Sequence, residues 1–341
     1  MSRPRRAAFR IGELDVAPGR SATGELPIAR LVTGTRISLP LQVFHGRTDG
    51  RVVWLSAAVH GDEINGVEII RRVTRSLDAR KMAGTVIAVP IVNVHGFLNG
   101  DRYLPDRRDL NRSFPGSPTG SLAARIADLF MSEIVRRCDV GIDLHTGSDH
   151  RTNLPHVRAD LDDPETRKLA EAFGAPLMLH SKTRDGSLRG AATERGATVL
   201  LYEGGEALRF DDESLSTGVV GIRQVLTELD MIDADSADPR PVPVESRHSS
   251  WIRARRSGIA LLDVELGEVV QRGQLLGLIH DSVGKRLSRV TATRVGIVIG
   301  RVQQPLVNQG DALVHLADVA PDVLPTLGRY ISTQPPSQDY P

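Results

Sequence analysis

The order of apolar runs and helical repeats predicts the fold of most of the chain. Four runs are nearly all apolar and rich in β-branched residues, as buried central strands require. They lie at 51–59, 85–94, 139–146 and 197–203, with a shorter strand expected at 176–180. Between them, apolar residues recur at helical spacing over 64–78, 121–137, 164–173 and 213–230. Strands that alternate with helices predict an α/β fold, in which helices flank a mostly parallel central sheet.

The segments on either side of this region have a different texture. Residues 1–45 hold short apolar pieces broken by Gly and Pro, which predicts either a hairpin at an edge of the sheet or a lead-in to it. Residues 232–248 lack periodicity and contain three prolines, which is typical of a linker. After it come short strands punctuated by glycine. We therefore expect an α/β domain at 1–231, the linker at 232–248, a small all-β domain at 249–320 and a tail at 321–341.

The expected all-β domain contains a weak internal repeat. Segments 257–279 and 295–317 align so that Gly258 corresponds to Gly296. Two similar halves of short strands predict a small barrel or sandwich. The pattern is similar to a biotinyl/lipoyl carrier domain, but the carrier's Met-Lys turn is absent and Lys285 lies before the second half. We therefore expect this domain to pack against the first one rather than to carry a prosthetic group.

Composition excludes several classes of protein. Lys+Arg 43 against Asp+Glu 42 gives a net charge of +1, so no global field attracts nucleic acid or an anionic membrane. No apolar run approaches the ~20 residues that span a bilayer, and Glu13 and Asp15 interrupt the stretch where a signal peptide would be apolar. A single cysteine, Cys138, excludes an internal disulfide and a Cys-rich zinc site. We expect a cytoplasmic protein that binds neither nucleic acid nor a membrane.

Two segments combine into a candidate metal site. In VHGDEING (59–66), His60 and Glu63 directly follow a strand, where a parallel sheet presents its ligands. In DLHTG (143–147), His145 lies at the end of another buried strand. Two histidines and one carboxylate are the ligand set of catalytic zinc in carboxypeptidase A, with a fourth position open to water. Asp143 is expected either to orient His145 or to be a simple turn or cap residue.

Two other segments suggest how a substrate is handled. RYLPDRRDLNRSFPG (102–116) is rich in arginine and follows a core strand, and guanidinium groups suit a carboxylate-bearing substrate. In LLYEGGE (200–206), Glu203 passes from an apolar strand into two glycines. A carboxylate there is either an exposed strand-end residue or a general base. Four more histidines are interpreted as structural or surface residues: His95, His150, His156 and His180.

Together these segments resemble the succinylglutamate desuccinylase/aspartoacylase family, relatives of the zinc carboxypeptidases. The H-x-x-E after a strand, the DLNRSFPG loop, the D-x-H-x-G segment and the E-G-G segment occur in the family's order and rough spacing. The resemblance covers about residues 45–230, and a barrel-like tail is also typical of such proteins. It implies a zinc carboxypeptidase-like fold and one zinc ion per chain, with His60, Glu63 and His145 as its ligands.

The resemblance also implies roles for the polar residues around the metal. Glu203 matches the general base, and Arg102 matches the arginine that polarises the scissile carbonyl. Asn111 and Arg112 match the pair that binds the substrate's free carboxylate. More residues separate Arg102 from DLNR here than in aspartoacylase, so Arg107 or Arg108 remains an alternative for the role of Arg102.

The function predicted in this way is zinc-dependent hydrolysis of the amide bond of an N-acyl amino acid. A zinc metallocarboxypeptidase acting on short peptides is the first alternative, because it uses the same centre on a peptide's last bond. A non-catalytic metal-binding protein is the second alternative, but the three candidate metal ligands and the candidate general base are all present. The expected partner is a small carboxylate-bearing N-acyl amino acid; the acyl group, the amino acid and whether the chain forms a homo-oligomer are left open.

Overall fold

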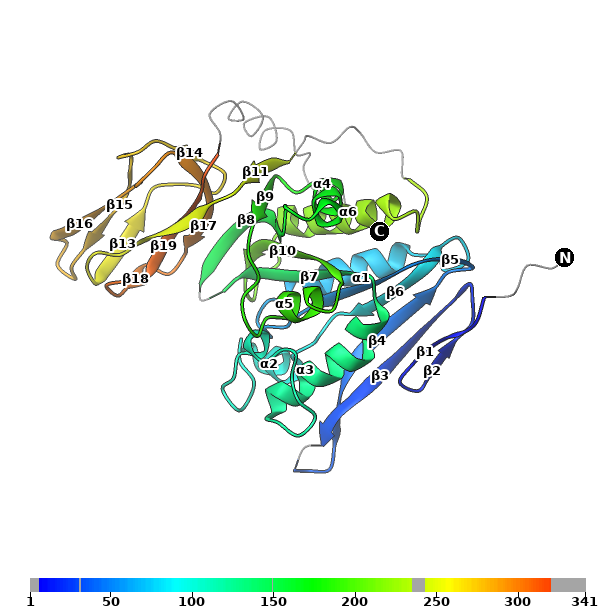
Figure 1. Cartoon of the computed structure of the whole chain (residues 1–341). Helices are drawn as coiled ribbons and strands as arrows, with labels where there is room; N and C mark the ends of the chain where they lie inside the picture. The colour runs from blue at the N-terminus through cyan, green and yellow to red at the C-terminus, as the bar shows by residue number, and fades with distance from the viewer. Residues whose placement is uncertain (1–5, 31, 149, 235–242, 320–341) are drawn as a thin grey trace.

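The computed structural model describes residues 6–30, 32–148, 150–234 and 243–319 (Figure 1). Its helices are α1 (Asn65–Ser76), α2 (Val94–Asn99), α3 (Leu122–Glu133), α4 (Pro164–Phe173), α5 (Leu188–Thr193) and α6 (Asp212–Glu228), with 3-10 turns η1 (Leu110–Arg112) and η2 (Val135–Arg137). The strands of the α/β region are β1 (Phe9–Ile11), β2 (Leu14–Val16), β3 (Arg20–Arg30), β4 (Arg36–His45), β5 (Thr48–Ala57), β6 (Ala83–Val89), β7 (Val140–Gly147), β8 (Arg151–Ala159), β9 (Leu177–His180) and β10 (Thr198–Glu206).

The central strands are parallel, as the apolar runs predict. β10, β7, β5 and β6 lie side by side in this order and pair in parallel. The strands on either side of these four pair antiparallel, β8 with β10 and β4 with β6, and β3 continues beyond β4. The mostly parallel core of the sheet is therefore confirmed, and antiparallel strands extend it in both directions.

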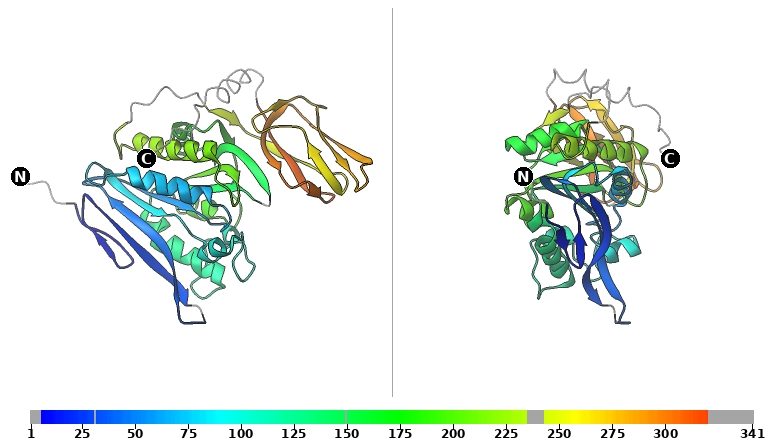
Figure 2. Two further views of the ribbon diagram at one scale, coloured as in Figure 1. Left: turned by 180° about the vertical axis from the view of Figure 1, so that it is seen from behind. Right: turned by 90° about the vertical axis from the view of Figure 1, so that its right-hand side faces the viewer.

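Helices cover both faces of the sheet (Figures 1 and 2). On one face, Ile69 of α1, Phe173 of α4 and Ile222 of α6 belong to one buried cluster with the strands. On the other face, Phe130 of α3 and Leu188 of α5 belong to a second cluster. The hairpin of β1 and β2 packs into this second cluster, so the first segment of the chain covers the sheet beside α3. Among the described residues, no helix is long and apolar enough to cross a membrane.

Several boundaries differ from the expectations for identifiable reasons. α4 spans the predicted 164–173, with Asp163 as its N-cap and Pro164 in its first turn. The strand expected at 85–94 ends at Val89, because Pro90 cannot donate to the ladder. The helix expected at 121–137 ends at Glu133 and continues as η2. Strand β8 is not among the expected strands, since its sequence RTNLPHVRA is polar and contains a proline.

The C-terminal strands form two packed layers. They are β11 (Val244–Ser246), β12 (Ser249–Arg253), β13 (Gly258–Leu262), β14 (Val269–Val270), β15 (Leu275–His280), β16 (Arg286–Thr291), β17 (Gly296–Val302), β18 (Leu306–Val307) and β19 (Ala312–Ala317). One layer is the sheet β16-β15-β13-β18. Leu276 of β15 shares a buried cluster with Val298 of β17 and Leu313 of β19, which places the two layers face to face.

The other layer, formed by β12, β19 and β17, is part of the main sheet. This arrangement differs from the expectation of a separate domain joined by an irregular linker. β17 pairs antiparallel with β8, so β12, β19 and β17 extend the central sheet, which has 13 strands in the described part of the chain. Within the expected linker, β11 pairs in parallel with β9. Residues 235–242 of that linker and the expected tail at 321–341 lie outside the described residues. The division of the chain into two domains therefore stays a proposal about folding units.

Candidate active site

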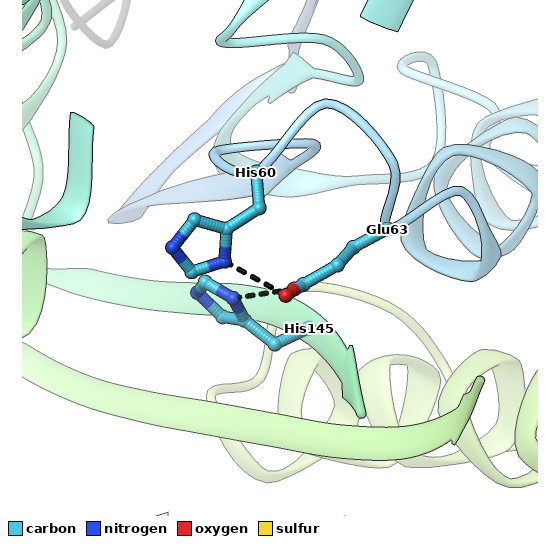
Figure 3. Close-up of side chains that lie close together, drawn as sticks. All are labelled: His60, Glu63 and His145. Atoms are coloured by element: carbon cyan, nitrogen blue, oxygen red, sulfur yellow. Dashed lines mark hydrogen bonds and ion pairs between the residues drawn. The ribbon is translucent and has the colours of Figure 1, made fainter. Parts of the chain in front are cut away.

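Three residues meet at the carboxyl ends of β5 and β7 (Figure 3). The Nδ1 atom of His60 lies 2.8 Å from Oε1 of Glu63, and Nδ1 of His145 lies 2.8 Å from Oε2 of the same carboxylate. All three side chains are buried, and their ligand atoms lie within 4.8 Å of one another. The backbone N–H of Thr146 also donates to Oε2 of Glu63, at 3.2 Å. The structure thus brings together the three residues that the sequence predicts as metal ligands.

The loop that carries His60 and Glu63 is pressed against the start of α2. A Cβ atom at Gly61 would lie 2.0 Å from the backbone carbonyl carbon of Gly96, so only glycine fits there. The loop leaves β5 after Ala57 and enters α1 at Asn65, which directs both His60 and Glu63 toward the neighbouring strand β7. The candidate ligands therefore rest on a strand end and a tightly packed turn, which fixes their positions.

A carboxylate holds the outer nitrogen of each imidazole. Nε2 of His60 lies 3.2 Å from Oδ1 of Asp109, and Nε2 of His145 lies 2.8 Å from Oδ2 of Asp143. The hydroxyl of Ser56 in turn donates to Oδ1 of Asp143, at 2.7 Å. These contacts orient both rings so that Nδ1 faces Glu63. Asp143 therefore orients His145, as one of the two interpretations of the sequence expects, whereas the sequence does not indicate the role of Asp109.

The buried charges shift one another's protonation. Burial alone lowers the pKa of His60, but Glu63 and Asp109 outweigh it and raise the pKa above its ordinary value. Asp143 and Glu63 likewise outweigh burial at His145 and raise its pKa well above the usual range. Burial raises the pKa of Glu63, yet the two histidines hold it far below its ordinary value. A positive charge between these three groups is thus strongly favoured.

The donor set fits a divalent metal ion. Two imidazole nitrogens and a carboxylate converge, all buried, and the second nitrogen of each ring is already bound to an acceptor. A metal ion in this position would replace the protons that the histidines otherwise carry toward Glu63. Among the described residues, the other group of suitable side chains, Asp160, Asp162 and His180, lies mostly exposed at the surface.

One arginine of the arginine-rich loop contacts this group. Nη1 of Arg102 donates to Oε1 of Glu63 at 3.3 Å, and Nη2 donates to Oδ2 of Asp109 at 2.9 Å. Arg107 and Arg108 are exposed and are not part of the cavity lining, although the sequence leaves them open as alternatives. Of Arg102, Arg107 and Arg108, Arg102 is therefore the one whose position suits contact with a substrate beside the metal group.

The following 3-10 turn carries the two residues expected to bind a carboxylate. Asp109 caps the turn, its Oδ1 accepting from the backbone N–H of Asn111 at 2.8 Å. The side-chain Oδ1 of Asn111 accepts from the backbone N–H of Leu188 at 2.9 Å, which ties the turn to α5. Asn111 and Arg112 both line the same cavity as the metal group.

Glu203 lies on β10 and lines the same cavity. Nδ2 of Asn153 donates to its Oε2 at 2.9 Å, and Nε of Arg158 lies 3.7 Å from its Oε1. Glu203 and His145 are register partners on adjacent strands, so the glutamate is held close to the metal group by the ladder. The structure therefore brings Glu203 into the predicted site, with two partners from β8 that the sequence does not suggest.

One cavity of about 350 Å³ is lined by the three candidate ligands together with Arg102, Asn111, Arg112 and Glu203. Seven arginines line it: Arg102, Arg112, Arg151, Arg158, Arg184, Arg189 and Arg253. Trp251 and Ala312 of the C-terminal strands line it too, so that part of the chain forms a wall of the cavity. The indole of Trp251 is stacked on His315, with ring centroids 4.4 Å apart, and the guanidinium of Arg151 lies over it. None of the histidines interpreted as structural contributes to the lining.

Comparison with known proteins places the chain in a family. Residues 49–229, more than half of the chain, match the family model of the succinylglutamate desuccinylase/aspartoacylase catalytic domain. The chain therefore belongs to the succinylglutamate desuccinylase/aspartoacylase family, which confirms the resemblance seen in its sequence.

Particular relatives extend the similarity beyond the matched region. The chain is 29% identical over 296 residues to the N-alpha-acetyl-L-2,4-diaminobutyric acid deacetylase of Halomonas elongata, covering 83% of this chain and 86% of that protein. It is 29% identical over 185 residues to the succinylglutamate desuccinylase of Burkholderia cenocepacia, covering 48% of this chain and 52% of that enzyme. The crystal structure of a succinylglutamate desuccinylase/aspartoacylase from Rhodobacter sphaeroides superposes with a TM-score of 0.80 at 28% identity, covering 92% of this chain and all of that one. Hydrolysis of the amide bond of an acylated amino acid is the activity common to the named relatives.

Proposed function

We propose that this protein is a zinc-dependent deacylase that hydrolyses an N-acyl amino acid carrying at least two acidic groups. The observation that carries the proposal is a single cavity that joins a His-Glu-His group, a glutamate and an excess of arginines. The relatives named as deacetylase and desuccinylase support the reaction class. Two imidazoles with one carboxylate favour zinc among the divalent metals.

The chain's residues divide the work of amide hydrolysis among them. Zinc, when bound, supplies a Lewis acid and lowers the pKa of water to about 7. Glu203 accepts the proton of the attacking water and passes it to the departing amine nitrogen. Arg102 donates hydrogen bonds to the carbonyl oxygen, where negative charge develops as water adds to the carbonyl carbon. Asn111 and Arg112 bind the free carboxylate of the amino acid, which holds the amide between Glu203 and the metal group.

The charge of the cavity supports a substrate with a second acidic group. Arg102 faces Glu63 and Asp109, and Arg158 faces Glu203. Arg189 differs, because it is only 6% exposed and forms no ion pair with a described carboxylate, and its Nη1 has no hydrogen-bond partner. Burial, with some contribution from Arg158, lowers its pKa to about 10. A buried guanidinium without a counter-ion is destabilising, and an anionic group of the substrate would offset that cost.

The same lining argues against a substrate with a cationic side chain. The substrate named for the Halomonas relative carries a free amino group, which needs an acidic partner. Here the two carboxylates of the lining are already engaged, Glu63 by histidines and Glu203 by Asn153 and Arg158. N-succinyl and N-acetyl derivatives of aspartate and glutamate are therefore the first compounds to test.

A panel of substrates tests the proposal. Amine release by the zinc-loaded protein is measured for N-succinyl-L-glutamate, N-acetyl-L-glutamate, N-acetyl-L-aspartate, N-acetyl-L-glutamine and N-alpha-acetyl-L-2,4-diaminobutyrate. We expect kcat/KM to be highest for a compound with two or more carboxylates. In Arg189→Met, this preference over N-acetyl-L-glutamine should fall about tenfold or more, the effect of losing a hydrogen bond to a charged group. Arg195→Ala, an exposed arginine just after α5, is the control and should keep the preference. Highest activity on the diaminobutyrate compound would contradict the acidic substrate but not the deacylase.

A second comparison separates the deacylase from a metallocarboxypeptidase. A carboxypeptidase needs an open groove, because most of its peptide lies outside the site. Trp251, Arg253 and Ala312 of the C-terminal strands close one side of the cavity here, which supports small substrates. The intact protein should therefore hydrolyse an N-acyl glutamate with a higher kcat/KM than a tetrapeptide ending in glutamate. The opposite order would favour the carboxypeptidase.

A further inference from the structure

Glu203, the candidate general base on β10, is held by two residues of the antiparallel neighbour β8. The side chain of Glu203 is 14% exposed, and each of its oxygens faces a different residue of β8. Oε2 accepts a hydrogen bond of 2.9 Å from Asn153, while Oε1 faces Arg158 at 3.7 Å. At these distances Asn153 makes a hydrogen bond and Arg158 only a longer ion pair. The orientation of the carboxylate therefore depends mainly on Asn153.

Asn153 is itself fixed from both sides by the backbone of neighbouring strands. It is register partner to Gly205 of β10 and to Gly300 of β17, and it is 7% exposed. The register between β10 and β8 shifts between Glu203 and Gly205, and this irregularity sets Asn153 beside the glutamate. A Cβ atom on Gly300 would lie 2.9 Å from Oδ1 of Asn153. The amide therefore has its oxygen against β17 and its N–H against Glu203.

We propose that Asn153 is a positioning residue that orients Glu203 for proton transfer, and that Gly300 of β17 leaves the room Asn153 needs. The inference rests on the proposed role of Glu203 as general base. The hydrogen bond from Asn153 uses one lone pair of Oε2, and because Glu203 lines the cavity, a water molecule there can donate its proton to the carboxylate. The C-terminal strands then take part in catalysis through the sheet, in addition to forming a wall of the cavity.

Substitutions at Asn153 test the inference through kcat. Asn153→Ala removes the donor, and Asn153→Asp keeps the shape but places a negative charge against Glu203. With the best N-acyl amino acid of the panel, both variants should lower kcat about tenfold or more, as expected for a lost hydrogen bond to a charged group. KM should stay within about twofold, since Asn153 acts through Glu203 and not through substrate binding. Thr152→Ala, the preceding residue of the same strand, is the control and should match wild type.

Gly300→Ala tests the same relationship without substituting either Glu203 or Asn153. The added methyl group should displace Asn153 and lower kcat in the same way, with bound metal and melting temperature checked in every variant. Asn153→Asp keeps the shape of the side chain, and Gly300→Ala keeps the Asn153 donor but displaces it. Wild-type kcat in both variants would therefore overturn the inference.

A double variant separates this inference from the proposed function. In Glu203→Gln, which should already lack most turnover, adding Asn153→Ala should lower kcat by no more than about twofold. A further tenfold loss would show that Asn153 acts independently of Glu203 and would overturn the positioning role alone. Full activity in Glu203→Gln would remove the base role from Glu203, and the positioning role would fall with it.

Discussion

Arg102 donates a hydrogen bond of 3.3 Å to Oε1 of Glu63, so the arginine proposed to act on the substrate touches a proposed metal ligand. Its other guanidinium nitrogen binds Asp109, which also holds His60. The metal group and the arginine therefore share two carboxylates. A substitution of Arg102 can therefore also disturb the metal group, and experiments on Arg102 must measure metal content as well as turnover.

Arg102→Ala should mainly lower kcat, because the charge it faces on the substrate develops only in the transition state. Loss of one such donor reduces kcat by about 10²–10³-fold. The measurement is kcat and KM at a fixed ratio of zinc to protein, with bound metal quantified. Arg107→Ala, on the exposed part of the same loop, is the control and should be unchanged. A large loss in Arg107→Ala instead would transfer the role to that residue.

Arg112→Ala should mainly raise KM. Its proposed contact with the substrate carboxylate is made equally in the ground and transition states, so kcat should change little. Loss of a charge-assisted contact corresponds to about a 10- to 100-fold rise in KM. Steady-state kinetics of this variant are compared with those of Arg102→Ala. The same kinetic profile in both variants would contradict the division of roles between the two arginines.

His145→Ala should abolish tight metal binding. It removes one of three buried donors and also leaves Asp143 without the imidazole it holds at 2.8 Å. Metal content is measured after dialysis against a weak chelator, with circular dichroism as the check on folding. His95 lies outside the cavity lining, so the control variant His95→Ala should retain one metal ion per chain. Stoichiometric metal in His145→Ala would exclude this residue as a ligand.

Glu203→Gln should retain metal and substrate binding and lose most turnover. The amide has nearly the same shape and still accepts a hydrogen bond from Asn153, but it cannot take a proton from water at neutral pH. The expected loss in kcat is about 10²–10⁴-fold. Binding of the N-acyl amino acid is measured by calorimetry beside the kinetics. Unchanged kcat would assign the base role to another group.

Acid should destabilise the protein in part through His156. Burial, together with the neighbouring Arg158, lowers the pKa of His156 to about 3. The unfolded chain, in which a histidine has a pKa of about 6.5, binds the extra proton between these two values, so stability falls as the pH drops below about 6.5. From pH 7 to pH 5 this one group should account for roughly 2 kcal/mol.

His156→Gln tests this contribution, since glutamine can keep the contacts to Leu154 and Arg158 without titrating. Its free energy of unfolding should decline less between pH 7 and pH 5 than that of wild type, as measured by urea denaturation at each pH. An equal decline in both proteins would show that His156 does not carry the effect. Other titrating groups are common to both proteins and cancel in the comparison.

Apolar periodicity and the ends of buried strands are the features that make part of this structure predictable from sequence. These features predict the parallel strands β5, β6, β7 and β10. They also predict the three candidate ligands, because parallel strands end at the same edge of the sheet. They do not predict strand β8, since its polar residues and Pro155 obscure its alternation. Asn153 and Arg158 therefore escape prediction together with the strand that carries them.

Arg189 escapes prediction for a different reason. It lies in α5 (Leu188–Thr193), a helix too short to show a periodic pattern. Only the fold brings α5 against the turn that carries Asn111, through the bond from the N–H of Leu188. A buried arginine without a carboxylate cannot be recognised from a local sequence, because both its burial and its missing partner depend on segments far apart in the chain.

The pairing of β17 with β8 has a consequence for how the chain unfolds and how it can be cut. Register partners such as Gly300 and Asn153 bind the C-terminal strands to the main sheet, so both parts should melt in one cooperative transition. A chain truncated before β12 would leave unpaired the outer N–H and C=O groups of residues 151–153 of β8, which β17 now covers, while β9 would still pair with residues 156–159. Such an exposed edge recruits strands of other molecules. Removing these strands should therefore yield aggregates rather than a smaller working enzyme.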